Sequence, residues 1–297
     1  MRINHNISSM ITQNSLFAVN RDMGKSLERL STGLRINRAS DDAAGLGVSE
    51  NLRTQVRGTA QAIRNSQDGI AAITIAEGAA NEVSSILQRM RELAVQSAND
   101  TLTSTERAYT NQEYGQLVDE IDRIAAVTNY NGMKLISSSG TNANERFGIG
   151  GNGGTGSALW IDANDSVGLD SITITIDTLT TTSLGSGAGS GSVGSMNETT
   201  LTSQTDAVAA IQSLDESIDS VNTMRSNMGA FINRLEHAIN NLMISNTNQQ
   251  AAESLIRDVD FAAETTQFTR NQILTQSGTA MLSQSNMLPQ GVLQLLQ

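Results

Sequence analysis

Residues 211–242, IQSLDESIDSVNTMRSNMGAFINRLEHAINNL, repeat apolar side chains alternately three and four positions apart. The series comprises Ile211, Leu214, Ile218, Val221, Met228, Ile232, Leu235, Ile239 and Leu242, and Arg225 takes its one position that is not apolar. A heptad pattern of this kind predicts a helix whose apolar seam packs against another helix. Burial of each aliphatic side chain contributes about 1.5–3 kcal/mol, but only where a partner covers it. The rest of the chain must therefore supply that partner.

Two segments on the N-terminal side have the pattern that such a partner needs. Residues 48–97 carry a heptad seam with one slip of register, and its expected members include Leu52, Val56, Ile63 and Ile70. Residues 104–128 carry a shorter seam that opens on Ser104-Thr105-Glu106, where a hydroxyl can cap the free amides. Three helices with thin seams can bury one another, so we expect a bundle that forms a rod.

The two ends of the chain carry weaker seams. Near the N-terminus the expected members are Ile3, Ile7 and Phe17 and then, after a slip of register, Leu27, Leu30 and Leu34. Residues 35–45 follow as a connector, and near the C-terminus the expected members are Phe261, Phe268 and Leu282. Neither end has enough apolar surface to be stable alone. We therefore expect both ends to be disordered in an isolated monomer and to order when they meet copies of themselves.

The middle of the chain has a different character. Short β-type runs occur at residues 134–136, 147–149, 159–161 and 172–176, and Gly-, Ser- and Asn-rich turns separate them. Residues 183–195 read as a low-complexity linker. The fold class expected from the whole pattern is mainly α. It is a long coiled-coil-like helical hairpin or bundle with a small β-hairpin region in the middle of the chain.

Composition excludes several classes of function. The formal net charge of −11 argues against partners that are nucleic acids or anionic membranes. The chain has no cysteine, which excludes disulfides, thiolate metal sites and thiol nucleophiles. The first thirty residues show no ordinary signal peptide, and no run of eighteen apolar residues occurs. The protein therefore stays inside the cell or leaves by a route that does not read such a peptide.

Three motifs suggest a phosphate-binding or metal-binding site, but the spacing of their residues does not fit one. The Gly-rich residues 147–156 lack the Lys-Ser/Thr that a phosphate loop needs, and residues 162–170 lack the register and final Glu of a calcium loop. The only histidines, His5 and His237, form no metal-binding pair of the HExxH type. We therefore predict no catalytic residue, no metal and no cofactor. An enzyme inserted in the middle region is the competing hypothesis from another class, and that region has no histidine to support it.

Four stretches carry a resemblance to a known family. They are SLERLSTGLRINRASDDAAGLGVSENLRTQVRG (26–58), QRMRELAVQSAND (88–100), DEIDRIAAVTNYNGMKL (119–135) and TRNQILTQSGTAMLSQSNMLPQGVLQLLQ (269–297). In order and position they resemble bacterial flagellin, in a short form with a reduced variable region. The resemblance implies a filament subunit for swimming, exported unfolded through the flagellar type III apparatus. It divides the chain into an inner core (1–45 and 258–297), a rod (46–135 and 201–257) and a solvent-facing region (136–200).

The resemblance also implies partners. These are other flagellin subunits, an export chaperone at the C-terminal segment, the filament cap and hook–filament junction proteins, and an animal toll-like receptor. The residues implied for the receptor are Arg89, Leu93, Gln96 and Glu113, which packing between subunits explains equally well. The implied location is extracellular, with a periplasmic or sheathed filament as the alternative. A hook–filament junction protein is the competing function within the same class.

Overall fold

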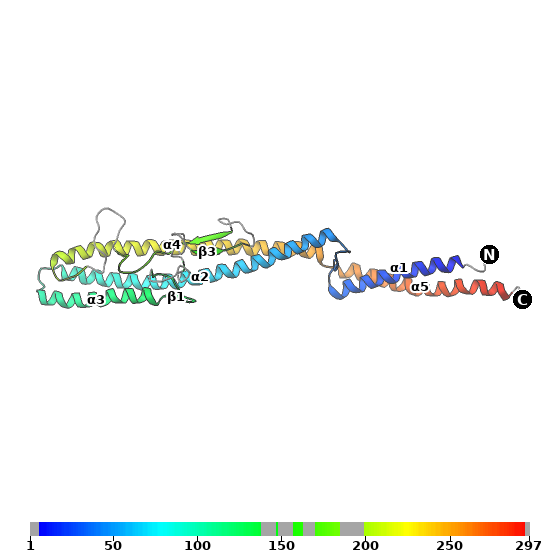
Figure 1. The fold of residues 1–297 in the computed structure, drawn as a ribbon, viewed down its shortest axis with the longest axis horizontal. Coiled ribbons are helices and arrows are strands. Elements are labelled where there is room, and N and C mark those ends of the chain that lie inside the picture. The colour runs from blue at the N-terminus through cyan, green and yellow to red at the C-terminus, as the bar shows by residue number, and fades with distance from the viewer. Residues whose placement is uncertain (1–5, 138–146, 148–156, 163–169, 185–198, 295–297) are drawn as a thin grey trace. The chain divides into compact units, whose positions relative to one another are not determined.

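The computed structural model describes residues 6–137, 147, 157–162, 170–184 and 199–294, and the side chains up to residue 287. Figure 1 shows a mainly helical chain, as the sequence predicted. The helices are α1 (Ile7–Thr32), α2 (Ala43–Ser97), α3 (Ser104–Val127), α4 (Gln204–Arg257) and α5 (Phe261–Gln294). The strands are β1 (Asn129–Tyr130), β2 (Met133–Lys134), β3 (Ser157–Trp160) and β4 (Ser171–Ile174).

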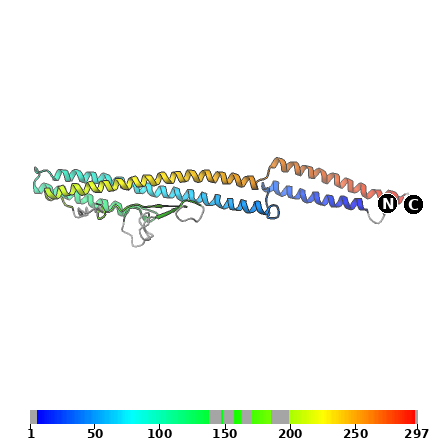
Figure 2. The same cartoon turned by 90° about the horizontal axis from the view of Figure 1, so that it is seen from above.

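The chain divides into two compact units. Unit 1 comprises Met1–Val56 with Thr247–Gln297, and unit 2 comprises Arg57–Asn246. In unit 2, α2, α3 and α4 lie side by side in both views (Figures 1 and 2), and their buried apolar residues form one core. The largest contributors from α2 and α3 are Ile73, Leu87, Met90, Tyr114 and Ile121.

The buried seam of α4 differs from the predicted one at every second position. Its members are Ala207, Ala210, Ser213, Leu214, Ser217, Val221, Met224, Met228, Leu235 and Leu242. Five of them were in the predicted seam, but Ser217 and Met224 take the places expected for Ile218 and Arg225. Both α2 and α3 contribute to the core that covers α4, so the buried face is wider than a coiled-coil seam. Small residues such as Ala210 and Ser217 take positions on this buried face of α4.

The other predicted rod-seam residues lie at the edges of buried faces. The half-buried ones are Ile211, Ile218, Ile232 and Ile239 on α4 and Leu52, Val56, Ile63 and Ile70 on α2.

Of the described helices, α2 alone is long and apolar enough to cross a membrane by length and composition. Its apolar residues Ile73, Ala76, Ala80 and Val83 are instead buried in the core of unit 2.

Local signals set the ends of α3. The helix is capped one residue earlier than predicted, because the hydroxyl of Thr103 accepts the amide of Glu106 and Glu106 accepts the amide of Thr103 at 2.8 Å. This reciprocal pair is a capping box. After α3, Asn131 (φ 51°) and Gly132 (φ 82°) turn the chain between β1 and β2, in the left-handed conformations that an Asn-Gly hairpin turn needs.

Within unit 2, the middle region packs onto the helices through the ribbon of β3 and β4 and through a strap, residues 175–184, that follows β4. Strands β3 and β4 pair antiparallel, with Ser157 opposite Ile174 and Trp160 opposite Ser171. The following strap is held by Asp122 on α3, whose carboxylate accepts the Thr181 amide at 2.9 Å and its hydroxyl at 2.7 Å. Of the predicted β-type runs, residues 148 and 149 lie outside the described residues, as do most of the Gly-rich stretch 147–156, the loop 162–170 and the linker 183–195.

We predict that Leu235→Ala destabilises unit 2 by about 2–5 kcal/mol, because it deletes a fully buried side chain and leaves a cavity. Urea unfolding followed by circular dichroism measures this change. The matched control is Ile244→Ala on the same helix, where the side chain is 65% exposed and the expected change is about 0.5 kcal/mol or less. Equal losses from the two substitutions would contradict the observed seam.

Candidate assembly site

Helices α1 and α5 form an antiparallel pair, called here the terminal pair (Figures 1 and 2). Three polar contacts fix its direction. The Asn6 side-chain amide donates to the Ser285 carbonyl at 2.8 Å, the Thr275 hydroxyl donates to Asn20 at 3.4 Å, and Arg29 pairs with Glu264 at 3.5 Å. Asn6 also caps α1, because its side-chain oxygen accepts the Ser9 amide. The start of α1 thus lies beside the end of α5.

The residues that face each other inside the terminal pair are largely polar or small. On α1 they are Ser9, Thr12, Leu16, Val19, Met23, Ser26 and Leu30, at alternating spacings of three and four. On α5 they are Glu264, Phe268, Asn271, Thr275, Gly278, Leu282 and Ser285, with the same spacing. Close approach occurs at Gly278, where an added Cβ would meet the Leu16 side chain at 2.6 Å. Among the described side chains of the two helices, only Ser26 and Ser285 are fully buried.

Many other large apolar side chains of the terminal pair are exposed and do not take part in this contact. We call them the outer apolar set. The exposed members are Ile7, Met10, Ile11, Phe17 and Leu27 on α1 and Phe261, Ile273, Leu274, Met281 and Met287 on α5. Phe17 is 73% exposed. Exposed apolar side chains gathered on one element in this number are typical of a site of protein association.

The structure divides the residues that the sequence assigned to the inner core. Ile7, Phe17, Leu27 and Phe261 are exposed and belong to the outer apolar set. Leu30, Leu34, Phe268 and Leu282 are half-buried, and Ile3 lies outside the described residues. The N-terminal part of the predicted α1 seam, including Ile7, Met10 and Phe17, is therefore not the line that faces α5. Sequence periodicity found an apolar line but did not tell which partner covers it.

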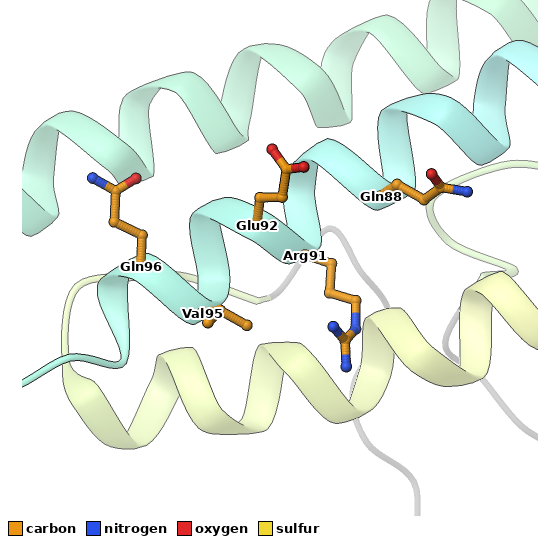
Figure 3. Close-up of a pocket in the computed structure, with 5 residues that line it drawn as sticks. All are labelled: Gln88, Arg91, Glu92, Val95 and Gln96. Carbon is orange, nitrogen blue, oxygen red and sulfur yellow. The ribbon is translucent and has the colours of Figure 1, made fainter.

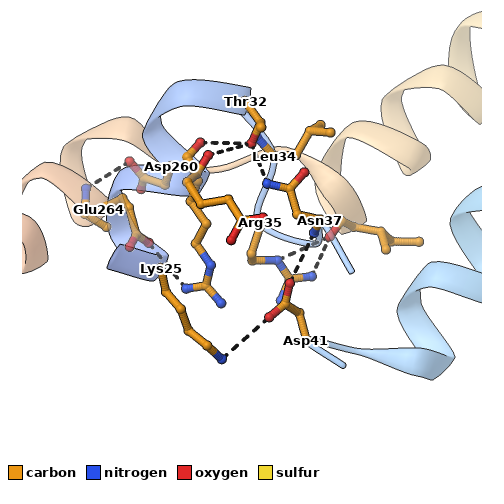
Figure 4. A network of polar contacts seen from close by, with 12 residues as sticks. Lys25, Thr32, Leu34, Arg35, Asn37, Asp41, Asp260 and Glu264 are labelled. Atoms are coloured by element: carbon orange, nitrogen blue, oxygen red, sulfur yellow. Dashed lines mark hydrogen bonds and ion pairs between the residues drawn. The ribbon is translucent and has the colours of Figure 1, made fainter. Parts of the chain in front are cut away.

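A short main-chain clasp joins the two ends of unit 1. Helix α1 ends at Gly33, whose φ of 73° is left-handed. The Arg35 amide then donates to the Arg257 carbonyl at 2.7 Å, and the Val259 amide donates to the Gly33 carbonyl at 3.0 Å. The Arg35 guanidinium donates to the Ile256 carbonyl at the end of α4, where a cation also complements the helix dipole (Figure 4).

Asp41 organises the connector between α1 and α2. Its carboxylate accepts the Arg38 amide at 3.1 Å and the Asn37 amide at 3.4 Å, and Lys25 lies 3.6 Å away (Figure 4). The hydrogen bond from the Arg38 amide is the main reason why the pKa of Asp41 lies below its ordinary value of 3.8, with the Asn37 amide and the charges of Lys25 and Arg29 acting in the same direction. The folded connector therefore stabilises the ionised form of the Asp41 side chain.

A second surface lies on unit 2. The Arg89 guanidinium on α2 donates to Glu113 on α3 at 2.9 Å and to Glu92 at 3.0 Å. The hydrogen bonds that Arg89 donates to Glu113 and Glu92 raise the pKa of Arg89, so the guanidinium stays charged. Nearby, Arg91 pairs with Asp215 on α4 at 2.6 Å. A shallow pocket here is lined by Gln88, Arg91, Glu92, Val95 and Gln96 (Figure 3).

Leu93 does not share this surface with Arg89, Gln96 and Glu113. It is 2% exposed, because Met90, Leu93 and Ala94 face the core of unit 2 while residues one position away face outward. Its expected role as a contact residue is corrected to packing between helices. Val95, which is half exposed, is the apolar side chain that the surface offers, and the helical period could have identified it.

Comparison with known families identifies the terminal and rod segments. A family model of the bacterial flagellin N-terminal helical region matches residues 3–141, and one of the bacterial flagellin C-terminal helical region matches residues 211–296. The chain belongs to the bacterial flagellin family. Flagellin of Halalkalibacterium halodurans is 45% identical over 297 residues, with 100% of both chains covered. The flagellar filament 33 kDa core protein of Treponema phagedenis is 44% identical over 298 residues, again with 100% of both covered.

The likeness of fold extends to a solved structure. A putative flagellar hook-associated protein from Vibrio parahaemolyticus aligns with a TM-score of 0.57 at 16% identity, over 73% of this chain and 99% of that one. This flagellin is a structural protein, a subunit of the flagellar filament. Within the described part of the chain, no three His, Asp or Glu side chains gather closely enough to hold a metal ion.

We predict that the Asp41 carboxyl titrates with a midpoint below 3.8 in the folded flagellin. Because the folded pKa is lowered, its contribution to stability is fully present above the ordinary value and is lost as the pH falls through the folded value. Carbon-detected NMR of the side-chain carboxyl measures the midpoint, and Lys25→Met, which removes one favourable charge, should raise it slightly. A midpoint at or above 3.8 in the wild-type protein would contradict the hydrogen bonding described.

Proposed function

We propose that the outer apolar set of the terminal pair is the surface through which copies of this flagellin polymerise, with the terminal helices in the filament core. The observation that supports this most strongly is the exposure of Phe17 on a helix whose opposite face already contacts α5. Covering one such side chain contributes about 1.5–3 kcal/mol. Association costs about 4–15 kcal/mol in lost freedom, so covering several members of the set offsets it.

The charge of the chain favours assembly that depends on specific contacts. A net charge of −11 makes free subunits repel one another until apolar surfaces meet. Salt at about 0.1 M screens exposed charges more than about 10 Å apart, so it weakens this repulsion and leaves the apolar contacts intact. Growth that speeds up with moderate salt is the behaviour expected of such a surface.

We predict that Phe17→Asp abolishes growth of filaments from purified seeds, because a charge replaces an apolar side chain at the proposed contact. Phe17→Leu is the matched control and should retain growth, since it keeps an apolar side chain at the same position. Phe17 is exposed, so neither change should alter the helix content of the monomer, which circular dichroism checks. Sedimentation of polymer after seeding measures growth.

The outcome that contradicts the proposal is growth of the Asp variant at the wild-type rate. Chains that lack residues 1–30 or the last forty residues test the same surface more coarsely. If either truncated chain extended seeds as well as the intact flagellin, the terminal pair would not be the polymerising element.

We propose that Arg89, Gln96 and Glu113 take part in packing between subunits, and that an animal toll-like receptor binds the same surface on free monomer. The charges here are held in a fixed arrangement by the bonds from Arg89 to Glu92 and Glu113. Arginine is among the residues that most often dominate an interface, and a rigid charged patch beside the exposed Val95 gives a partner both polar and apolar contacts.

We predict that Arg89→Ala weakens binding of the monomer to the immobilised receptor ectodomain about tenfold or more, as for an arginine at the centre of an interface. Arg64→Ala is the control, because Arg64 is also exposed on α2 and, within the described part of the chain, its side chain bonds to Gln61 on the same helix. Surface plasmon resonance measures both affinities. Equal affinities for the two variants would remove Arg89 from the proposed contact.

The remaining partners follow from where the apolar surface lies. An export chaperone that holds the subunit before secretion would cover the α5 members of the outer apolar set, such as Ile273 and Met281. Cap and hook–filament junction proteins would meet the same terminal helices at the two ends of the filament. The full-length similarity to flagellins supports the main filament subunit over the junction protein. We propose an extracellular filament, with a periplasmic or sheathed one as the alternative that cryo-electron tomography of the source cell would distinguish.

A further inference from the structure

Of the four exposed methionines among the described residues, three belong to the outer apolar set. Met10 is 57% exposed, Met281 63% and Met287 59%. Each occupies the heptad position of another exposed member of the set. Met10 lies seven residues before Phe17, Met281 seven after Leu274, and Met287 fourteen after Ile273. The three thioethers are therefore part of the same apolar lines as side chains that have no oxidisable atom.

Methionines elsewhere in the described chain are mostly shielded. Met90, Met224 and Met228 are buried in the core of unit 2, and Met23 and Met133 are half-buried. Met243 on α4 is the one other exposed methionine among the described residues. Because the chain has no cysteine, thioethers are its only sulfur groups, and no thiolate competes with them for an oxidant.

We propose that Met10, Met281 and Met287 form an oxidant-sensitive site, at which hydroperoxides convert the free subunit into one that no longer polymerises. The thioether sulfur attacks one oxygen of the hydroperoxide, so an S–O bond forms and the O–O bond breaks. The sulfur is oxidised by two electrons to a sulfoxide, and the departing oxygen takes up a proton to leave as water or an alcohol. This inference rests on the proposed function of the outer apolar set.

The sulfoxide changes the surface without changing the fold. It replaces an apolar, flexible group by a polar one with a strong acceptor oxygen. On the exposed monomer that oxygen bonds to water, so the terminal pair is not strained. When another subunit covers the position with apolar side chains, the oxygen loses water without gaining a donor, which opposes association. In a finished filament the same covering would keep oxidant away from the thioethers.

The test compares the intact flagellin with a variant in which Met10, Met281 and Met287 are all changed to leucine. Leucine keeps an apolar side chain of similar volume but cannot be oxidised. Both proteins are treated with hydrogen peroxide as monomers, and the peroxide is then removed. Peptide mass spectrometry identifies the oxidised methionines, and filament seeds are added to measure growth. We expect the critical concentration of the treated wild type to rise about tenfold, equivalent to about 1.4 kcal/mol, and that of the treated variant to stay unchanged. A Met243→Leu variant should lose growth like the wild type.

Two results would overturn the proposal. One is undiminished growth of wild-type subunits in which mass spectrometry finds all three sulfoxides. The other is an equal loss of growth by the treated triple-leucine variant. Failure of the proposed function is distinguishable, because it would appear without peroxide, as normal growth of Phe17→Asp. Restoration of growth by methionine sulfoxide reductases would support the assignment further.

Discussion

The contact between α1 and α5 places its polar and small residues inward and leaves much of its apolar surface outward. Serine, threonine, asparagine and glycine take about half of the positions that face across the pair, where Thr275 bonds to Asn20 and Gly278 allows close approach to Leu16. Phe17, Ile273 and Met281 are left to water. Such a pair is helical but poorly covered, and this exposed apolar surface is the basis of the proposed contact between subunits.

Unit 2 covers its apolar surface within one chain. Its seam on α4 is closed by α2 and α3, so Leu214, Val221 and Leu235 are fully buried without help from another copy. The capping box of Thr103 and Glu106 and the Asp122 strap fix the ends of this bundle. In unit 1 the clasp between Gly33 and Val259 joins the two chain ends by main-chain bonds and needs little apolar burial. Unit 2 thus buries its own apolar seam, while unit 1 has its two chain ends joined but leaves much apolar surface exposed.

Periodicity in the sequence was enough to predict the helices and the bundle of unit 2. It could not choose between neighbouring positions where a third helix widens the buried face, and so it assigned Ile218 and Arg225 to a seam that Ser217 and Met224 fill. The resemblance to flagellin, rather than periodicity, named Leu93 as a receptor contact, although this side chain faces the core together with Met90 and Ala94. Periodicity found only part of the inner line of the terminal pair, namely Leu30, Phe268 and Leu282. A search for large apolar residues overlooks the serine, threonine and glycine positions between them.

The central claim is that the terminal helices need other subunits for their stability, and hydrogen exchange tests it most directly. In dilute monomer the account predicts that amides of α1 and α5 exchange far faster than those in the core of unit 2, for example around Leu87 and Leu235. In polymerised flagellin the same terminal amides should become strongly protected. Terminal helices that are already as protected in the monomer as the core of unit 2 would contradict the account.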